Sequence, residues 1–354
     1  MSLVKNSTII VLGIMVSNIL AYCFHLYVGR ALGPTDYGIF GALMSLFLII
    51  ALPAGAISSA IAKFSSRFKL KQEYGKIGAL RRMVQDKVII FGIIIFFLIT
   101  ILSKFISDYL KIGSNFSVML IGLILIFALI LPVNRGILQG MKKFKEYSLN
   151  SIIESVSRLI LVIILIYLGF GVNGAILAYG IAYLIAFLLI FRQIKETGKY
   201  QDHKKAINMK IVLKFILLVL LANLFLQMLI NAPTLFIKHY FSSEFTGFWT
   251  ASLTLARISL FIATAIALVM FPEISGNDNP KERKIIFLKS LGLTLIATTG
   301  IALVFLLFGK FAINILYGSA YLPSLPILQW MGIVMILIGA LQLIMNYFLA
   351  ICNH

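Results

Sequence analysis

Five polar side chains lie inside apolar segments of the sequence, where a charged or amide group is costly to bury. They are Glu154, Arg158, Arg257, Asn18 and Asn223. Both arginines are ~15 Å from the ends of their apolar runs at ~1.5 Å per helical residue, which puts them near the middle of a membrane. A guanidinium offers paired N–H donors to phosphate oxygens. The sequence therefore predicts a cationic cavity for a phosphate or pyrophosphate group, with all five residues in contact with substrate.

The local spacing leaves two interpretations open for the charged residues. Glu154 precedes Arg158 by four positions, so the two side chains share a helix face and can pair. They form either a neutral structural pair or part of the cavity. Arg257 has no acidic residue three or four positions away, which favours the cavity over an arginine that binds backbone carbonyls.

Long apolar runs must position these side chains. Hydrophobic residues make up 61% of the 354 positions, and the mean hydropathy is +1.03. A helix needs ~20 apolar residues to cross a hydrocarbon core of ~30 Å. The sequence predicts an all-α, polytopic membrane protein with about ten transmembrane helices. The apolar runs cover residues 8–28, 38–62, 88–103, 117–133, 149–168, 174–191, 211–231, 247–270, 286–308 and 323–351.

Basic residues are distributed unequally between the two sides of these runs. Of the 31 Lys and Arg residues, 24 fall in segments on the side of the N-terminus and five on the other. The positive-inside rule then puts both termini in the cytoplasm, in the cell membrane. The basic loops are expected to lie against membrane lipids. The net charge of +19 does not indicate nucleic-acid binding, because no aromatic platform or basic recognition helix accompanies it.

The remaining reactive side chains do not form a recognisable catalytic or metal-binding pattern. The two cysteines and four histidines are scattered, so neither a metal site nor another cofactor is expected. The outer segments offer Asp108 and Glu244 without a partner carboxylate. We therefore expect that the protein is not an enzyme.

The sequence also contains a weak internal repeat. Residues 38–42 align with residues 247–251 at an offset of 209, the difference between 38 and 247, and the same offset superimposes the first two apolar runs on the seventh and eighth. This predicts two parallel six-helix repeats, with the second incomplete. Residues 1–209 are predicted to form an N-terminal six-helix bundle, and residues 210–354 a C-terminal bundle with four of six helices.

Residues 29–40, Gly-Arg-Ala-Leu-Gly-Pro-Thr-Asp-Tyr-Gly-Ile-Phe, resemble the first outer loop of the Wzx-type or RfbX-like polysaccharide flippases, members of the multidrug/oligosaccharidyl-lipid/polysaccharide (MOP) exporter superfamily. Residues 231–250 resemble the matching junction, with Pro233 where the family has an Asp and Trp249 where it has a Tyr. The acidic group that the family has at this position is therefore absent from this sequence.

The resemblance implies a flippase that moves a polyprenyl-(pyro)phosphate-linked oligosaccharide from the cytoplasmic to the outer leaflet, for cell-surface polysaccharide or glycan synthesis. Its partners would be that lipid and polysaccharide-assembly proteins. Two alternatives remain: a truncated relative that does not transport, and a multidrug or cation exporter of the same superfamily. A cation exporter should carry unpaired carboxylates inside the membrane, whereas the deep charge here is net positive, which favours an anionic substrate.

Overall fold

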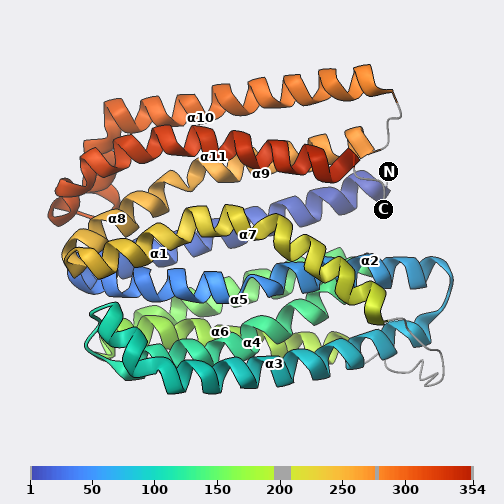
Figure 1. Cartoon of the computed structure of the whole chain (residues 1–354), viewed down its shortest axis with the longest axis horizontal. Coiled ribbons are helices and arrows are strands. Elements are labelled where there is room, and N and C mark those ends of the chain that lie inside the picture. Colours follow the sequence, from blue (N-terminus) through green and yellow to red (C-terminus); the bar gives the residue numbers. More distant parts are fainter. Residues whose placement is uncertain (1, 195–208, 276–278, 352–354) are drawn as a thin grey trace. The chain divides into compact units, whose positions relative to one another are not determined.

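The structure is a computed structural model that describes residues 2–194, 209–275 and 279–351 (Figure 1). Within these ranges the chain is helical and contains no strand. It forms two compact units. Unit 1 comprises Met1–Leu32 and Ile39–Phe241, and unit 2 comprises Gly33–Gly38 and Ser242–His354. The predicted repeat boundary at residue 209 stays a prediction, because packing units and sequence repeats divide a chain by different criteria.

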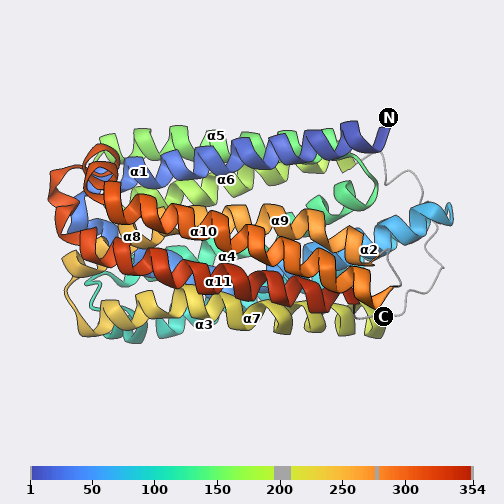
Figure 2. The ribbon, with the colours of Figure 1, turned by 90° about the horizontal axis from the view of Figure 1, so that it is seen from above.

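Unit 1 is a bundle of long helices that run side by side along one direction (Figures 1 and 2). The most extensive packing joins α3 to α4, α2 to α4, and α5 to α6, with α6 also against α4. This arrangement makes α4 the central helix of unit 1. The helices are α1 (Ser2–Ile50), α2 (Pro53–Leu70), α3 (Tyr74–Tyr109), α4 (Asn115–Gly140), α5 (Phe144–Tyr167), α6 (Gly171–Ile194) and α7 (Met209–Tyr240).

Unit 2 is a smaller bundle in which α11 packs against both α9 and α10. Its helices are α8 (Ser243–Ala256), α9 (Ile258–Ser275), α10 (Pro280–Leu316), the 3₁₀ helix η2 (Ser319–Ser324) and α11 (Leu325–Ile351). A short segment of α1, Gly33–Gly38, belongs to this unit. There the buried ring of Tyr37 packs against Tyr317 and Tyr321, with ring centroids 5.8 and 6.2 Å away.

Eight described segments are long and apolar enough to cross a membrane, or nine if the two bent parts of α7 count as one span. The first of them, Leu12–Leu70, contains most of the first predicted run (8–28) and all of the second (38–62). The predicted outer loop between these runs is mostly helical, and the chain kinks only at Gly33, where φ is +74°. The second run is in turn interrupted before Pro53, where α2 begins. The prediction of a polytopic, all-α membrane protein is confirmed.

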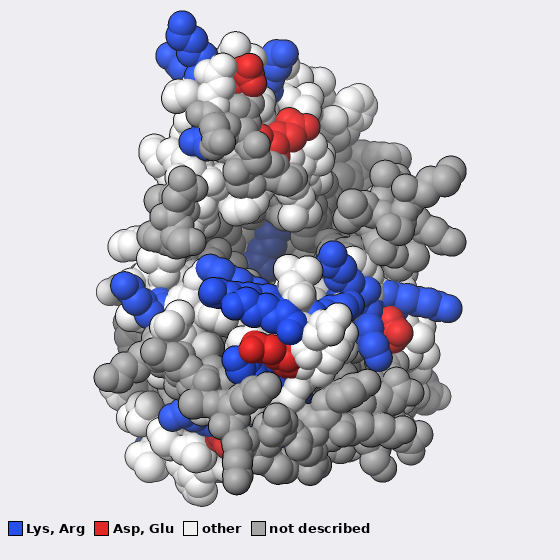
Figure 3. Space-filling model, turned by 90° about the vertical axis from the view of Figure 1, so that its right-hand side faces the viewer, with Lys and Arg blue, Asp and Glu red and all other residues white. Residues whose placement is uncertain are grey.

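The polar turns of unit 1 lie at its two ends. At one end, Lys69 Nζ of α2 donates to the backbone oxygen of Met141, in the turn between α4 and α5, at 2.5 Å. Figure 3 faces this end, at the right of Figure 1, and shows Lys and Arg side chains gathered there. At the other end, Lys238 Nζ of α7 donates to the backbone oxygen of Lys111 at 3.1 Å. Among the described residues of unit 1, Lys and Arg side chains therefore gather at the end that carries the α4–α5 turn (Figure 3).

Two glycines that the repeat alignment pairs, Gly38 and Gly247, contact each other's helices in unit 2. A Cβ atom on Gly38 would overlap the backbone oxygen of Ser243, and one on Gly247 would overlap that of Pro34. Each glycine therefore faces the carbonyl four residues before the other, and each pair of equivalent residues is 209 positions apart. This reciprocal contact has the symmetry expected of a parallel repeat.

We expect Gly247→Ala to lower the free energy of unfolding by about 1–3 kcal/mol, because the added methyl must displace backbone rather than a flexible side chain. Gly292→Ala in α10 is the matched control, since nothing lies within 4 Å of its Cβ position. That change should be neutral or stabilising by up to ~1 kcal/mol. Thermal unfolding of the purified protein in detergent measures both. Equal transition temperatures for the two variants would contradict the close approach.

Candidate functional site

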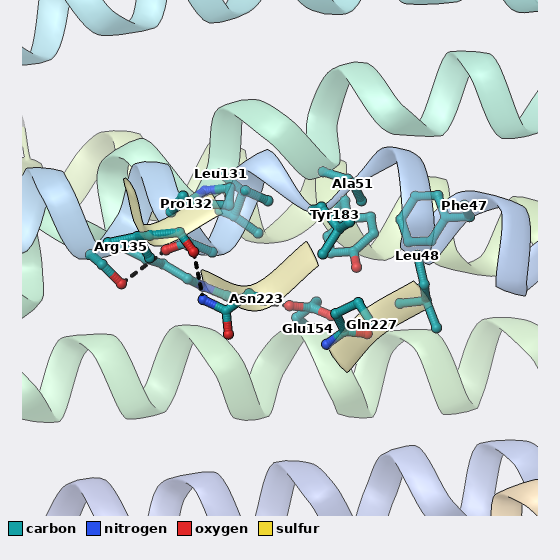
Figure 4. A pocket seen from close by; sticks show the side chains of 17 residues that line it. Phe47, Leu48, Ala51, Leu131, Pro132, Arg135, Glu154, Tyr183, Asn223 and Gln227 are labelled. Carbon is teal, nitrogen blue, oxygen red and sulfur yellow. Dashed lines mark hydrogen bonds and ion pairs between the residues drawn. The ribbon is translucent and has the colours of Figure 1, made fainter. Parts of the chain in front are cut away.

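A cavity of about 560 Å³ lies inside unit 1, between the second half of α1 and helices α2, α4, α5, α6 and α7 (Figure 4). Pockets of ~300–1,000 Å³ are typical of small-molecule sites. Most of the lining is apolar, including Leu48, Leu131 and Pro132. The polar lining residues are Ser59, Arg135, Glu154, Tyr183, Asn223 and Gln227.

Glu154 of α5 binds two arginines at the wall of this cavity. Its Oε2 atom is 2.8 Å from Nη2 of Arg135 in α4, and its Oε1 atom is 3.2 Å from Nη1 of Arg158, one turn along α5. The Glu154 side chain is only 8% exposed, and that of Arg135 is 16% exposed. Two guanidiniums thus share one carboxylate, so this ion triad carries a formal charge of +1 at the cavity.

Asn150, one turn before Glu154 in α5, fixes the orientation of Arg135. Its Oδ1 atom accepts a hydrogen bond from Arg135 Nε at 2.9 Å, and its backbone oxygen accepts one from Nη2 at 3.4 Å. Its Nδ2 atom donates to the backbone oxygen of Ala186 in α6 at 2.8 Å. Asn150 therefore links three helices, and it leaves Nη1 of Arg135 with no hydrogen-bond partner among the residues that the structure describes.

Arg158 is buried behind Glu154 and is absent from the cavity lining. Its guanidinium carbon lies 4.5 Å from the ring centroid of Tyr179 and 5.6 Å from that of Phe24. Its side chain is 8% exposed, and within the described residues its Nε atom has no hydrogen-bond partner. The predicted pairing with Glu154 is present. The contacts of Arg158 are those of a structural cation held by a carboxylate and two aromatic faces.

The other predicted site residues are dispersed. Asn223 of α7 lines the cavity and donates its Nδ2 to the backbone oxygen of Val219 at 2.8 Å. Asn18, in the first half of α1, is partly buried and does not line this cavity. Arg257 belongs to unit 2, where it is partly buried at the junction of α8 and α9. A substrate contact for Asn18 and Arg257 stays a prediction.

The structure places Arg135 inside a helix, whereas the fourth predicted apolar run ended at residue 133 and left Arg135 among the 24 basic residues of the segments on the side of the N-terminus. The helix continues to Gly140, so Arg135 is a helical residue inside unit 1. Gly136 and Gly140 held the relevant signal, because small residues four positions apart mark close helix packing in membranes. In the structure, Cβ atoms at these glycines would overlap the backbone of α2 at Ser58 and Ala62.

Gln227 was also missed. It lies four residues from Asn223 and four from Asn231, so the three amides form one stripe along α7. A polar stripe on an otherwise apolar helix is the pattern that would have indicated it. Among the described residues, no group of three or more His, Cys, Asp or Glu side chains is arranged as a metal site.

A model of the polysaccharide biosynthesis protein family matches residues 3–278 of this sequence. The chain belongs to this family. An uncharacterized membrane protein of Methanocaldococcus jannaschii is 29% identical over 294 residues, which cover 78% of this chain and 68% of the relative. The family assignment agrees with the resemblance drawn from residues 29–40 and residues 231–250.

Solved structures of two transporter types share the fold. The lipid II flippase MurJ, in an inward closed conformation, matches with a TM-score of 0.77 and 16% identity, over 97% of this chain and 76% of MurJ. A multidrug resistance MATE transporter of the MOP superfamily, in an inward-facing conformation, matches with a TM-score of 0.73 and 16% identity, over 95% and 84% of the two chains. The family assignment and the fold together show a multi-pass membrane protein that shares the fold of these transporters.

Proposed function

We propose that this protein is a flippase that moves a polyprenyl-(pyro)phosphate-linked oligosaccharide from the cytoplasmic to the outer leaflet of the cell membrane, for synthesis of a surface polysaccharide or glycan. The proposal rests mainly on the positive ion triad of Arg135, Glu154 and Arg158 at a cavity inside a membrane-spanning bundle. A net positive charge inside a membrane-spanning bundle favours a substrate with an anionic group. The flipped lipid would then reach polysaccharide-assembly proteins at the outer face.

Arg135 is the residue best placed to bind the phosphate. Its side chain lines the cavity, its Nε and Nη2 atoms are held by Asn150 and Glu154, and the two N–H donors of its Nη1 atom have no partner among the described residues. A phosphate oxygen can accept these donors without breaking the ion pair. The sugar and phosphate would pass through the cavity while the polyprenyl tail stays in the bilayer. That Arg257 and Asn18 also contact the substrate is a separate proposal.

The ion triad disfavours a multidrug or cation exporter. Glu154 is the acidic residue at the cavity, and both its oxygens are already bound to guanidiniums. A cationic substrate would have to displace an arginine to reach it, and would be repelled by the second one. This charge balance separates the proposed lipid-linked anion from an organic cation.

Expression in a strain that lacks its oligosaccharide flippase tests the proposed function. We expect the wild-type chain to restore surface polysaccharide, and Arg135→Met at the same membrane abundance to fail. A chain that is inserted in the membrane but restores none would support a non-transporting relative. Resistance to cationic drugs without restored polysaccharide would support the multidrug exporter.

The proposed orientation has both termini in the cytoplasm. It predicts which side of the membrane holds each of two exposed positions, one at the start of α4 and one just after its end. In a background with Cys23→Ser and Cys352→Ser, a membrane-impermeant maleimide should label Asn115→Cys in intact cells. Lys145→Cys should be labelled only after permeabilisation, because it lies in the first turn of α5, next to the basic α4–α5 turn. The reverse labelling pattern would contradict the orientation.

A further inference from the structure

We infer that the cavity of unit 1 contains a sugar-binding subsite, formed by Asn223 and Gln227 of α7 with Tyr183 of α6, which reads the sugar attached to the phosphate. This inference rests on the proposed function. It assigns the phosphate to Arg135 and the first sugar to a different set of side chains, so the two can be tested separately.

The two amides of α7 present unused hydrogen-bonding groups to the cavity. Asn223 donates its Nδ2 to the backbone oxygen of Val219, which leaves its Oδ1 as an acceptor. Gln227 Oε1 accepts from Asn231 Nδ2 at 2.9 Å, which leaves its Nε2 as a donor. Neither free group has a partner in the described parts of the chain. Since residues four apart on a helix are ~5–6 Å apart at Cβ, an acceptor and a donor lie side by side.

Tyr183 and Phe47 provide an aromatic wall in the same cavity. Their rings are stacked, with centroids 6.3 Å apart and an interplanar angle of 27°, and both residues line the cavity. The Tyr183 ring offers a flat apolar face with a polar hydroxyl at its edge. A sugar ring has the matching character, because its C–H faces are apolar and its hydroxyls both donate and accept hydrogen bonds.

The size and composition of the cavity limit what it can hold. At about 560 Å³ it suits a group of small-molecule size rather than an extended oligosaccharide. One wall carries the guanidinium of Arg135, and others carry two amides and a phenol. Leaving the remaining amide oxygen and amide N–H groups without a partner inside a membrane is costly unless water or a ligand satisfies them. The matching group is a phosphate together with the sugar bonded to it.

The test compares binding of two probes to the purified protein. One probe is undecaprenyl phosphate, and the other is the same lipid with one hexose on the phosphate, taken from a panel of glucose, galactose, mannose and N-acetylglucosamine. We expect the wild-type protein to bind at least one sugar-bearing lipid more tightly than the sugar-free lipid. Asn223→Leu combined with Gln227→Met should reduce that affinity about tenfold, as expected for the loss of two hydrogen bonds. Affinity for undecaprenyl phosphate should not change.

Asn346→Leu in α11 is the matched control. Asn346 also donates Nδ2 to the carbonyl four residues earlier, at 2.8 Å, but it lies in unit 2 and does not line this cavity. It should leave both affinities unchanged. The inference is overturned if the α7 double variant binds all sugar-bearing lipids as tightly as the wild type, or if it loses affinity equally for the sugar-free lipid. If Arg135→Met changes neither affinity while the double variant loses only the sugar-dependent gain, the phosphate assignment fails and the sugar subsite stands.

Discussion

Replacing Arg135 with methionine is expected to weaken binding of undecaprenyl phosphate by about thirtyfold or more, since losing one partner of a buried, hydrogen-bonded charge pair costs about 2 kcal/mol or more. The reason is that Arg135 is the arginine that lines the cavity, and its Nη1 atom has no hydrogen-bond partner among the described residues. The protein should still fold, because Glu154 keeps its ion pair with Arg158 at 3.2 Å. Isothermal titration calorimetry, with the lipid titrated into the detergent-solubilised protein, measures the change in affinity.

Arg135→Lys separates charge from geometry at the same position. An ammonium keeps the positive charge but cannot hold Asn150 and Glu154 while it presents a planar pair of donors. We therefore expect an affinity between those of the wild type and of Arg135→Met. Arg158→Met removes the same net charge at the far side of Glu154 but keeps the donors of Arg135, so it should lose less affinity than Arg135→Met because Arg158 does not line the cavity. A greater loss in Arg158→Met than in Arg135→Met would reverse the assignment.

Removing the shared carboxylate should produce the largest loss of stability. Glu154→Leu leaves two arginines, 8% and 16% exposed, without their common counter-ion. Breaking a buried ion pair by removing one partner costs about 3–5 kcal/mol. We expect a marked fall in the temperature at which the detergent-solubilised protein loses its monodisperse elution profile. Arg158→Leu alone should cost less, because Glu154 remains paired with Arg135.

The double variant Glu154→Leu with Arg158→Leu completes the test of this ion triad. Deleting both members of a buried pair removes the uncompensated charge, so the double variant should be more stable than Glu154→Leu alone. Arg135 would still be held by Asn150 and open to the cavity. Additive losses from the two single changes would show that Glu154 and Arg158 do not interact energetically, and would contradict the pairing.

The helical, membrane-spanning character of the chain could be predicted because it depends on the length of the apolar runs and on the period of their hydrophobic residues, which are local properties of the sequence. The Glu154 and Arg158 pair could be predicted as well, since a spacing of four residues along one helix places the two side chains close together. Gly38 and Gly247 illustrate a further case. The repeat alignment matched them, and the structure shows that their helices cross at these two glycines.

The remaining site could not be predicted because it depends on where helices end and which of them are neighbours. Arg135 lies only two residues beyond the predicted end of its run, and this small shift separates a loop residue from a cavity residue. Its contact with Glu154 joins α4 to α5 across the bundle. For Arg158 the sequence left a structural pair and a cavity role open, since depth in the membrane does not determine whether a side chain faces a cavity or the aromatic rings behind it.

The most direct test of the central claim is the movement of a lipid-linked sugar between leaflets of vesicles that contain only this protein. The probe is undecaprenyl-phosphate hexose with a fluorophore on the sugar, quenched by an impermeant reductant outside. We predict that wild-type protein exposes the inner-leaflet pool to the reductant, while Arg135→Met vesicles with the same protein content lose only the outer-leaflet signal, as protein-free vesicles do. Wild-type vesicles that behave like protein-free vesicles, or equal rates for wild type and Arg135→Met, would contradict the proposal that Arg135 carries the phosphate across.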